Sequence, residues 1–427
     1  MTTIKDYETN HLHSLDIPLK SDGSEYSLHD LFPDQRRAVV TVLHTLHDFL
    51  TTDDLTDFKP LRMTVNGQGG SGKSVVINTL LTVIRKMVGF TGVAKVIAPT
   101  GVAACNVSGE TFHHLFNMPI AESAYKAKTM SKSTRMKLIS KFELILALII
   151  DERSLMTSKL FGTSECMMAE TIYGGGHNSD VKWGGLPILV LVGDDFQLPG
   201  FGEGALHVLS KFSCSGSKMV VNGRQQLLEA AETVVDLGAS KRVRESEVET
   251  KSLMARLRIG NPNDSDIDKL LSLHLENVKQ KHGVEMKRFI ESKALYLFFK
   301  NAKRVKHNNY MLSLQSSSEN PVARIFMQSK SNKTGKGIKR HFDGDIPFKS
   351  MICVGAMVRL IGRNFNPLWG LYNGAGGIVK EIIFREGTSP NDNHMPSYIV
   401  VEFPNYTGPP WDLDNPKVSS FKLLTTK

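Results

Sequence analysis

The stretch that decides the fold is GQGGSGKS, residues 67–74, which lies between the apolar segment LRMTV (61–65) and the helix-like segment SVVINTLLTVIRKMVG (74–89). The pattern GxxxxGK[ST] between a strand and a helix is typical of a P-loop. Its glycines allow backbone N–H groups to converge on phosphate oxygens, and the start of the following helix adds a favourable dipole. In such a site the lysine neutralises the β- and γ-phosphates and the serine hydroxyl binds Mg²⁺. The sequence therefore predicts a nucleoside triphosphate site made by Gly67, Gln68, Gly69, Gly70, Ser71, Gly72, Lys73 and Ser74.

Short apolar runs elsewhere in the first half predict the sheet that carries this motif. AKVIA (94–98), LILALII (144–150) and LPILVLV (186–192) are too short for buried helices and rich in branched residues. Such runs are typical of central parallel strands covered on both faces. Residues 31–50 show apolar residues at helical spacing after a proline and predict an amphipathic helix. Strands alternating with helices through about residue 245 predict a doubly wound α/β domain.

Polar residues follow two of these strands directly. LILALII leads into Asp151 and Glu152, so both carboxylates are expected at the carboxyl edge of the sheet, where such folds bind ligands. There Asp151 can hold Mg²⁺ and Glu152 can orient or deprotonate the attacking water. The alternative is an N-capping acidic pair that opens the next helix.

The other polar stretch is GDDFQLPG (193–200), which follows LPILVLV. In a parallel sheet this strand should end beside LILALII, which predicts that Gln197 lies near the γ-phosphate as a sensor and holds the attacking water. The alternative is a turn stiffened by Pro199, in which Asp194 and Asp195 only cap the backbone.

The net charge and composition of the chain indicate what kind of partner it binds. The formal net charge is +9 and the pI about 9.2, which favours a polyanion such as nucleic acid. Residues 126–141 carry six basic residues and no acidic one, typical either of a solvated helix face or of a surface that faces phosphates. Four isolated cysteines indicate reduced, mostly buried thiols, and the absence of a long apolar run predicts an intracellular protein without a membrane partner.

The pattern changes after residue 245. Two helical stretches (252–261 and 266–278) lead to ALYLFF (294–299), which predicts a strand opening a second α/β unit. Residues 329–341 are typical of a flexible basic linker. The last ninety residues contain short strand-like runs separated by Gly, Pro and Asn and predict a small β-rich module with strands at AMVRLI (356–361), GGIVKEIIF (376–384) and SYIVVEF (397–403).

Four motifs in order resemble one family: the P-loop, APTGVAACNVSGETFHHLF (98–116), IIDERSLM (149–156) and GDDFQLPG. This order is similar to the Pif family of ATP-dependent DNA helicases, RecD-related enzymes of superfamily 1B that translocate 5′ to 3′ on single-stranded DNA. The resemblance extends over roughly residues 30–425. It implies a first RecA-like ATPase domain at 1–245, with a small basic wedge subdomain near 118–141. A partial second RecA-like domain would follow at 246–427, with an SH3-like β insert near 345–427.

The resemblance also implies roles for single residues. Gln35 would contact adenine, although by itself it would be interpreted as an exposed helix residue. Arg242 in VVDLGASKRVRE (234–245) would reach the γ-phosphate from the second domain, with Arg244 as its rival. The implied catalytic set is thus Lys73, Glu152, Gln197 and Arg242, with Ser74 and Asp151 on the metal. The residues implied to lie along DNA are Thr100, Gly101, Thr111, His113, Asn373 and Gly374.

Three features depart from the family pattern. Position 200 is Gly where the family usually has a second proline, and position 153 is Arg where many members have an apolar residue. The expected T-x-H-K-S-Q-G segment does not follow Lys427, so a C-terminally truncated motor is predicted.

These features lead to a prediction of function with two alternatives. We predict an ATP- and Mg²⁺-dependent DNA helicase that acts as a monomer on single-stranded DNA and duplex junctions. It would serve DNA repair, recombination or telomere maintenance, in the nucleus or mitochondrion of a eukaryote. One alternative is a non-unwinding remnant that binds ATP and single-stranded DNA. The other is a P-loop NTPase of a different class, such as a switch protein or small-molecule kinase.

Overall fold

The chain forms two compact units, residues 1–262 and 263–427. The computed structural model describes residues 17–118, 131–173, 181–200, 218–238, 246–293, 295–326, 342–343, 346–347, 349–361, 365–366, 369–372, 374–390, 394–410 and 414–422. Sequence reasoning places the division at residue 245. The structure instead assigns the helix α9 (Val248–Arg258) to the first unit.

A six-stranded parallel sheet forms the centre of the first unit, with the strand order β3-β2-β4-β5-β1-β6. The strands are β1 (Leu61–Asn66), β2 (Ala94–Ala98), β3 (Glu110–Thr111), β4 (Ala147–Ile150), β5 (Ile188–Gly193) and β6 (Thr233–Asp236). The predicted α/β class and its central strands are therefore confirmed. Because all strands run in one direction, their carboxyl ends meet at one edge of the sheet.

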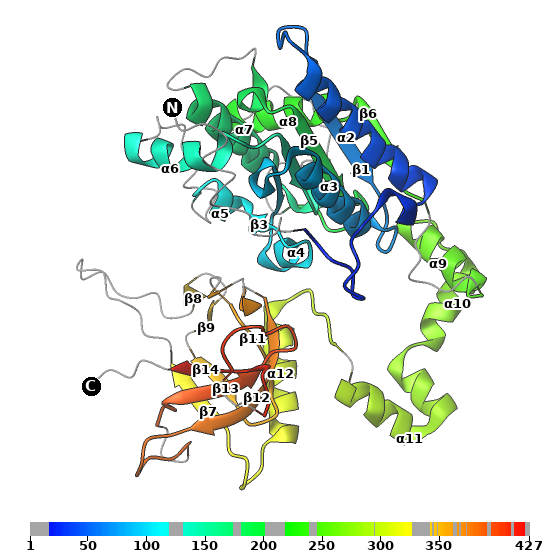
Figure 1. The fold of residues 1–427 in the computed structure, drawn as a ribbon. Helices are drawn as coiled ribbons and strands as arrows, with labels where there is room; N and C mark the ends of the chain where they lie inside the picture. Colours follow the sequence, from blue (N-terminus) through cyan, green and yellow to red (C-terminus); the bar gives the residue numbers. More distant parts are fainter. Residues whose placement is uncertain are drawn as a thin grey trace. The chain divides into compact units, whose positions relative to one another are not determined.

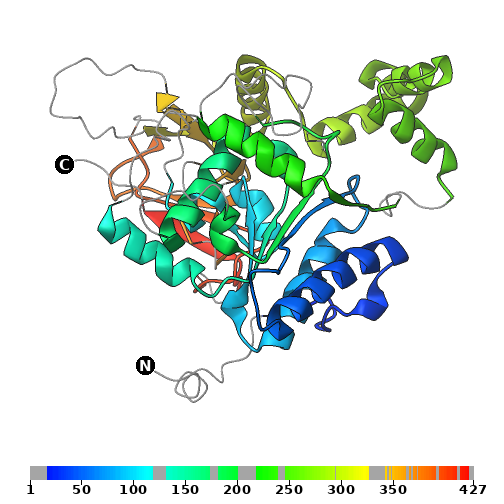
Figure 2. The same cartoon turned by 90° about the horizontal axis from the view of Figure 1, so that it is seen from above.

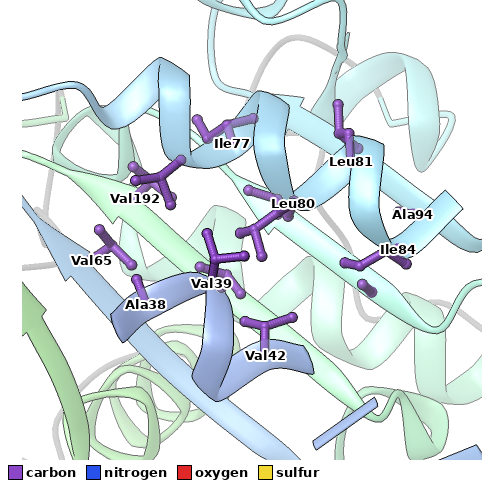
Figure 3. Packing of buried hydrophobic residues seen from close by; sticks show 14 of the residues in the cluster. Ala38, Val39, Val42, Val65, Ile77, Leu80, Leu81, Ile84, Ala94 and Val192 are labelled. Carbon is purple, nitrogen blue, oxygen red and sulfur yellow. The ribbon is translucent and has the colours of Figure 1, made fainter. Parts of the chain in front are cut away.

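Helices cover both faces of this sheet. Figures 1 and 2 show α2 (Pro33–Thr51) and α3 (Lys73–Val88) on one side, and α7 (Ser158–Tyr173) and α8 (Lys218–Ala230) on the other. Successive residues of a strand point to opposite faces, so Val190 and Val192 of β5 pack with α2 and α3, whereas Leu189 and Leu191 pack with α7 and α8. Figure 3 shows the first of these two cores, in which branched side chains of both helices meet Val65 and Val192.

Two glycines set the limits of α3. Gly72 precedes the helix with φ 88° and Gly89 follows it with φ 76°, both in the left-handed region where a Cβ is costly. The helix end predicted at Gly89 is thus confirmed. A proline in its first position opens α2, since the missing N–H would have no partner inside the helix.

The second unit is built from helices and antiparallel sheets. Its helices are α10 (Asp264–Ser272), α11 (Leu275–Lys293) and α12 (Asn301–Gln315). The predicted β-rich module is confirmed as a four-stranded sheet of β11 (Met357–Arg359), β12 (Gly376–Ile383), β13 (Tyr398–Glu402) and β14 (Val418–Lys422). The shorter pairs are β7 (Ala323–Phe326) with β10 (Lys349–Ile352), and β8 (Phe342–Asp343) with β9 (Ile346–Pro347). Every pairing described in this unit is antiparallel, so a second RecA-like domain and an SH3-like insert stay predictions.

The strand predicted at ALYLFF is wrong. Residues 295–299 lie in no strand, and the side chains of Leu295, Leu297 and Phe299 are exposed: Leu297 is 86% accessible and Phe299 fully so. A strand needs a neighbour for its N–H and C=O groups, and none of the described strands pairs with this segment. The linker predicted at 329–341 lies outside the described residues.

Among the described residues, three cysteines, Cys105, Cys166 and Cys353, are free thiols. Cys353 is buried and the other two are partly accessible, so the expectation of mostly buried thiols holds only in part. Burial raises the pKa of the Cys166 thiol to about 12. No helix within the described ranges is both long and apolar enough to span a bilayer.

Candidate functional site

The P-loop begins where β1 ends and is fixed against the neighbouring strand. Gly67 N donates a 3.0 Å hydrogen bond to the carbonyl of Gly193, the last residue of β5. A Cβ at Gly67 would lie 2.2 Å from Ser71 Oγ and 3.2 Å from Leu237 Cβ, so a larger residue would displace these side chains. Gly70 has φ 86°, another left-handed position. The local sequence therefore forces the loop to wrap tightly in front of α3.

Lys73 and Ser74 occupy the first turn of α3, as the motif predicts. The Lys73 ammonium donates to the carbonyl of Gly67 at 2.7 Å and to that of Gln68 at 3.3 Å, so it lies over the loop. Ser74 is exposed, and its hydroxyl is accessible at the helix N-terminus. This arrangement offers one cation, one hydroxyl and several backbone N–H groups to an anion.

Gln35 lies under the P-loop, although residue type alone favours an exposed position. Its side chain is buried, and Nε2 donates to the carbonyl of Ser71 at 2.9 Å while Oε1 accepts from Phe32 N at 3.1 Å. A Cβ at Gly72 would lie 2.2 Å from this Nε2. The amide of Gln35 therefore connects the start of α2 to the loop.

Asp151 and Glu152 lie at the carboxyl end of β4, which pairs with β5 as expected. Burial raises the pKa of Asp151 to about 6, although its carboxylate accepts a 2.9 Å hydrogen bond from Glu152 N. A buried carboxylate that is costly to ionise suits a divalent cation, because the cation offsets the burial. Glu152 adopts φ 51°, and its side chain forms no cap hydrogen bond, which argues against a simple capping role.

The sensor loop, residues 193–200, begins beside the P-loop because Gly193 pairs with Asn66. Asp194 is buried and accepts hydrogen bonds from Phe196 N at 3.1 Å and from Gln197 Nε2 at 3.3 Å. Asp194 thus caps the turn, as one interpretation expects, and also holds the exposed Gln197 amide, whose place near the γ-phosphate stays a prediction.

Arg153 is a member of this site that sequence reasoning noted only as a departure. Its guanidinium is buried, forms a salt bridge with Asp195, and donates to Asn66 Oδ1 and to Thr64 Oγ1, the latter at 3.3 Å. A Cβ at Gly193 would lie 2.6 Å from Arg153 Cγ, so the glycine makes room for this side chain. Arg153 therefore joins three stretches at the sheet edge: β1, the segment after β4 and the sensor loop.

Gly200, the other departure, also has a physical reason. Its N–H donates a 2.8 Å hydrogen bond to the carbonyl of Ser154, which a proline could not do. A Cβ at this position would lie 2.8 Å from the carbonyl oxygens of Leu155 and Met156. Gly200 thus allows the end of the sensor loop to pack closely on the segment that follows Glu152.

Arg258, the last residue of α9, is a second functional candidate that the sequence did not indicate. Its guanidinium contacts Asp194 and lies 4.5 Å from the centre of the Phe196 ring. The same side chain helps to line a cavity of about 360 Å³ together with Asn66, Gly67, Gln68, Asp236, Leu237 and Gly238. The cavity opens beside the first residues of the P-loop.

Four of the residues implied to face DNA lie at or just after the carboxyl ends of β2 and β3. Thr100 Oγ1 accepts from Ala103 N at 3.2 Å and caps α4 (Gly101–Asn106), which starts at Gly101. Thr111 Oγ1 accepts from His114 N at 3.3 Å and caps α5 (Phe112–Leu115), which includes His113. Both hydroxyls therefore have structural partners, and a DNA role for these four residues stays a prediction.

Other predicted residues fall elsewhere. Arg242, Arg244 and Asn373 lie outside the described residues, as do residues 119–130 of the expected wedge. Residues 132–141 of the basic segment 126–141 belong to α6 (Lys132–Phe142). In this helix Lys141 Nζ donates to the carbonyl of His114 at 3.1 Å. Gly374 lies in a turn of the second unit with φ 102°.

A strand–P-loop–helix unit, with acidic residues after one neighbouring strand and a glutamine loop after another, defines a P-loop protein of the RecA-like α/β type. The profile of the family described as PIF1-like helicase matches residues 50–265, just over half of the chain. The chain belongs to this family.

Curated relatives match about a third of the chain. The ATP-dependent DNA helicase RRM3 of Saccharomyces cerevisiae is 31% identical over 153 residues, which cover 36% of this chain and 20% of that protein. The ATP-dependent DNA helicase Pif1 of Bdellovibrio bacteriovorus is 31% identical over 137 residues, covering 32% of this chain and 28% of that protein. The chain thus matches less than a third of the length of either relative.

Solved structures match over more of the chain. Pif1 helicase from Candida albicans has a TM-score of 0.57 at 18% identity, covering 91% of this chain and 77% of that one. Bacteroides Pif1 bound to single-stranded DNA has a TM-score of 0.52 at 22% identity, covering 88% and 72%. At these identities the likeness shows the fold, which agrees with the parallel sheet described above.

Proposed function

We propose that this protein is an ATP-dependent DNA helicase that translocates 5′ to 3′ on single-stranded DNA. The observation that carries the proposal is the convergence of Lys73, the Asp151–Glu152 pair and Gln197 at one edge of the sheet of a PIF1-like helicase family member. Bacteroides Pif1 has been crystallised with single-stranded DNA, and two Pif1 helicases have been described at forked duplex DNA. The basic charge of this chain supports the same class of partner.

The proposal assigns a role in ATP hydrolysis to each of these side chains. The P-loop N–H groups and Lys73 bind the β- and γ-phosphates. Gln35 holds the P-loop through its hydrogen bond to the Ser71 carbonyl and also faces the adenine. Ser74 and Asp151 would hold Mg²⁺, which supplies charge neutralisation on the phosphates when bound. Glu152 accepts the proton of the attacking water.

The remaining steps concern coupling to DNA. Gln197 orients the attacking water and responds to the γ-phosphate, and Arg242, or its neighbour Arg244, stabilises the charge that develops on that phosphate. Thr100, Gly101, Thr111 and His113, with Asn373 and Gly374 in the second unit, would lie along the DNA backbone. We propose a monomer that acts in the nucleus or mitochondrion in repair, recombination or telomere maintenance.

The test is ATP hydrolysis measured with and without single-stranded DNA. DNA should raise the rate, and the stimulation should weaken steeply with salt because phosphate contacts release counterions. Lys73→Ala should lower turnover by about a hundredfold or more, since the lysine is the main cation on the phosphates. Lys303→Ala, on the exposed face of α12, is the matched control and should leave turnover unchanged.

The second candidate function is an ATP- and single-strand-binding remnant that does not unwind. It is supported by the antiparallel pairing of every strand described in the second unit, where a second RecA-like domain would have parallel strands. If the protein binds ATP equally well with and without DNA and hydrolyses it at the same rate in both cases, the result would favour the remnant over the motor. Absence of nucleotide binding would contradict both.

A further inference from the structure

Both carboxylates of the sensor loop are held by arginines from other elements. Asp195 pairs with Arg153, which follows β4, and Asp194 pairs with Arg258 from α9. We propose that Arg258 is a positioning residue: through Asp194 it holds Gln197 in its working orientation and connects the sensor loop to α9. This inference rests on the proposed function, because the orientation of Gln197 matters to an ATPase.

The contact between Arg258 and Asp194 has the geometry of a strong ion pair. Arg258 Nη2 lies 2.6 Å from Asp194 Oδ1, and Nη1 donates to Oδ2 at 2.7 Å. Two parallel N–H···O bonds from one planar guanidinium fix orientation as well as distance, which a lysine cannot reproduce. The guanidinium also lies over the Phe196 ring, whose face attracts a cation. The Arg258 guanidinium, the Asp194 carboxylate and the Phe196 ring therefore form one cluster of contacts that joins α9 to the sensor loop.

The buried position of Asp194 explains why the loop needs this arginine. Its carboxylate is almost inaccessible, and an unpaired buried charge is strongly unfavourable. Burial by itself raises the pKa of Asp194, but the hydrogen bonds from Arg258 and Phe196 N, together with the charges of Arg258 and Lys73, outweigh it and the pKa is lowered overall. Without Arg258, Asp194 would have to move toward water or take up a proton. Either change alters the carboxylate that accepts the hydrogen bonds of Phe196 N and Gln197 Nε2.

The effect reaches Gln197 because the same carboxylate holds the sensor turn. Asp194 Oδ1 accepts from Phe196 N and Oδ2 accepts from Gln197 Nε2, while Gln197 N donates to the Asp194 carbonyl at 3.0 Å. The Gln197 amide is otherwise exposed, so these bonds restrict where it points. A displacement of about 1 Å at a catalytic amide can cost a hundredfold in rate.

Arg258 is also well placed to transmit movement along the chain. It ends α9, where the helix dipole favours a positive charge, and the chain enters the second unit at Asn263. It lines the cavity beside Gly67 and Gln68, so it lies near the P-loop as well as the sensor loop. Any shift of α9 therefore displaces Asp194 and, with it, the Gln197 amide.

The experiment compares Arg258→Gln with Lys251→Gln, which removes a positive charge from the same helix without touching the loop. For Arg258→Gln we expect kcat to fall by about tenfold or more while KM for ATP changes less than about threefold, because the residue orients the loop and does not bind substrate. Lys251→Gln should retain the wild-type rate. Arg258→Lys keeps the charge but loses the two-pronged contact, and should recover only part of kcat.

A double-mutant cycle shows whether Arg258 acts through Gln197. On a Gln197→Ala background, Arg258→Gln should lower kcat less than about twofold further. A full additional loss on that background, or a wild-type rate for Arg258→Gln alone, would overturn the proposal. A change confined to KM would also overturn it, since it would assign Arg258 to substrate binding.

Hydrogen exchange separates this inference from the proposed function. Exchange of the Phe196 and Gln197 amides should rise by about tenfold in Arg258→Gln and stay unchanged in Lys251→Gln, while the β5 amides keep their protection and report an intact fold. This readout needs no ATPase activity. If the wild-type protein fails to hydrolyse ATP, the proposed function fails while the exchange result still decides the positioning role. Unchanged exchange at both amides would refute it.

Discussion

In the first unit every residue of β4 and β5 is buried, whereas in the second unit the apolar side chains of Leu297 and Phe299 are exposed almost completely. Both regions are short apolar runs. The runs of the first unit have parallel neighbours on both sides and helices on both faces. Residues 295–299 have no such neighbour among the described strands. Burial therefore depends on neighbours that come from distant parts of the chain.

This contrast indicates which part of the fold can hold catalytic side chains in fixed positions. The candidate site lies at the edge of a sheet whose strands are fixed by two cores, so its carboxylates, lysine and amide have well-defined positions. Catalytic groups need such support because small displacements lower the rate. In residues 295–299, Tyr296 and Phe298 contact His307 of α12, whereas Leu297 and Phe299 are exposed.

The largest expected effect compares a buried and an exposed leucine. Leu80→Ala, in the fully buried part of α3, should lower the free energy of unfolding of the first unit by about 2 to 5 kcal/mol, because it removes methyl groups from a packed core and leaves a cavity. Leu297→Ala should change the free energy of unfolding of the second unit by less than about 0.5 kcal/mol. Amide exchange under native conditions, read at β4 and β5 for the first unit and at β12 and β13 for the second, measures the two energies without assuming that both units unfold together.

The comparison would fail if the two substitutions had similar effects. A loss above about 1 kcal/mol from Leu297→Ala would mean that residues 295–299 are buried against another part of the protein in solution. Val305→Ala, a partly exposed position on α12, is a matched control for the second unit and should behave like Leu297→Ala.

The same contrast explains how much the sequence could predict. The P-loop, α3 and the strands β2, β4 and β5 follow from local patterns: fixed glycine spacing, helical periodicity and continuous apolar runs. The positions of Asp151 and Gln197 follow because parallel strands end at a common edge. ALYLFF shows the limit of that reasoning, since an apolar run indicates a tendency to pair but cannot show that a partner strand exists.

Other parts of the site depend on contacts between distant residues. Gln35 is buried because Ser71, 36 positions later, accepts its hydrogen bond. Arg258 contacts Asp194 across 64 positions, and no motif includes it. Arg153 is adjacent to the acidic pair, but its partner Thr64 is 89 positions away. A single sequence without aligned relatives contains no signal for such pairs; covariation between relatives could have found them.

A smaller effect is expected from Arg153, a buried arginine of the first unit. Arg153→Leu introduces the apolar type that many family members have, yet it should destabilise this chain by about 1 to 3 kcal/mol because Asp195 and Asn66 lose their donor. The double variant Arg153→Leu and Asp195→Asn should recover part of that loss, since no unpaired carboxylate remains. Chemical denaturation monitored by exchange of the β5 amides measures both. A neutral Arg153→Leu would show that the first unit tolerates the change by apolar packing alone.

The smallest effect on stability is expected where the second unit exposes its apolar residues. Leu297→Lys combined with Phe299→Lys should change the free energy of unfolding by less than about 0.5 kcal/mol, because neither side chain leaves a core. The same pair should lower the binding of a hydrophobic dye and the tendency to associate, since exposed apolar patches promote both. Met136→Lys, an exposed single residue on α6, is the control and should alter dye binding less. If the double lysine variant destabilised the protein while dye binding stayed constant, these residues would belong to a buried contact, and the two units would be more alike in packing than their exposed surfaces indicate.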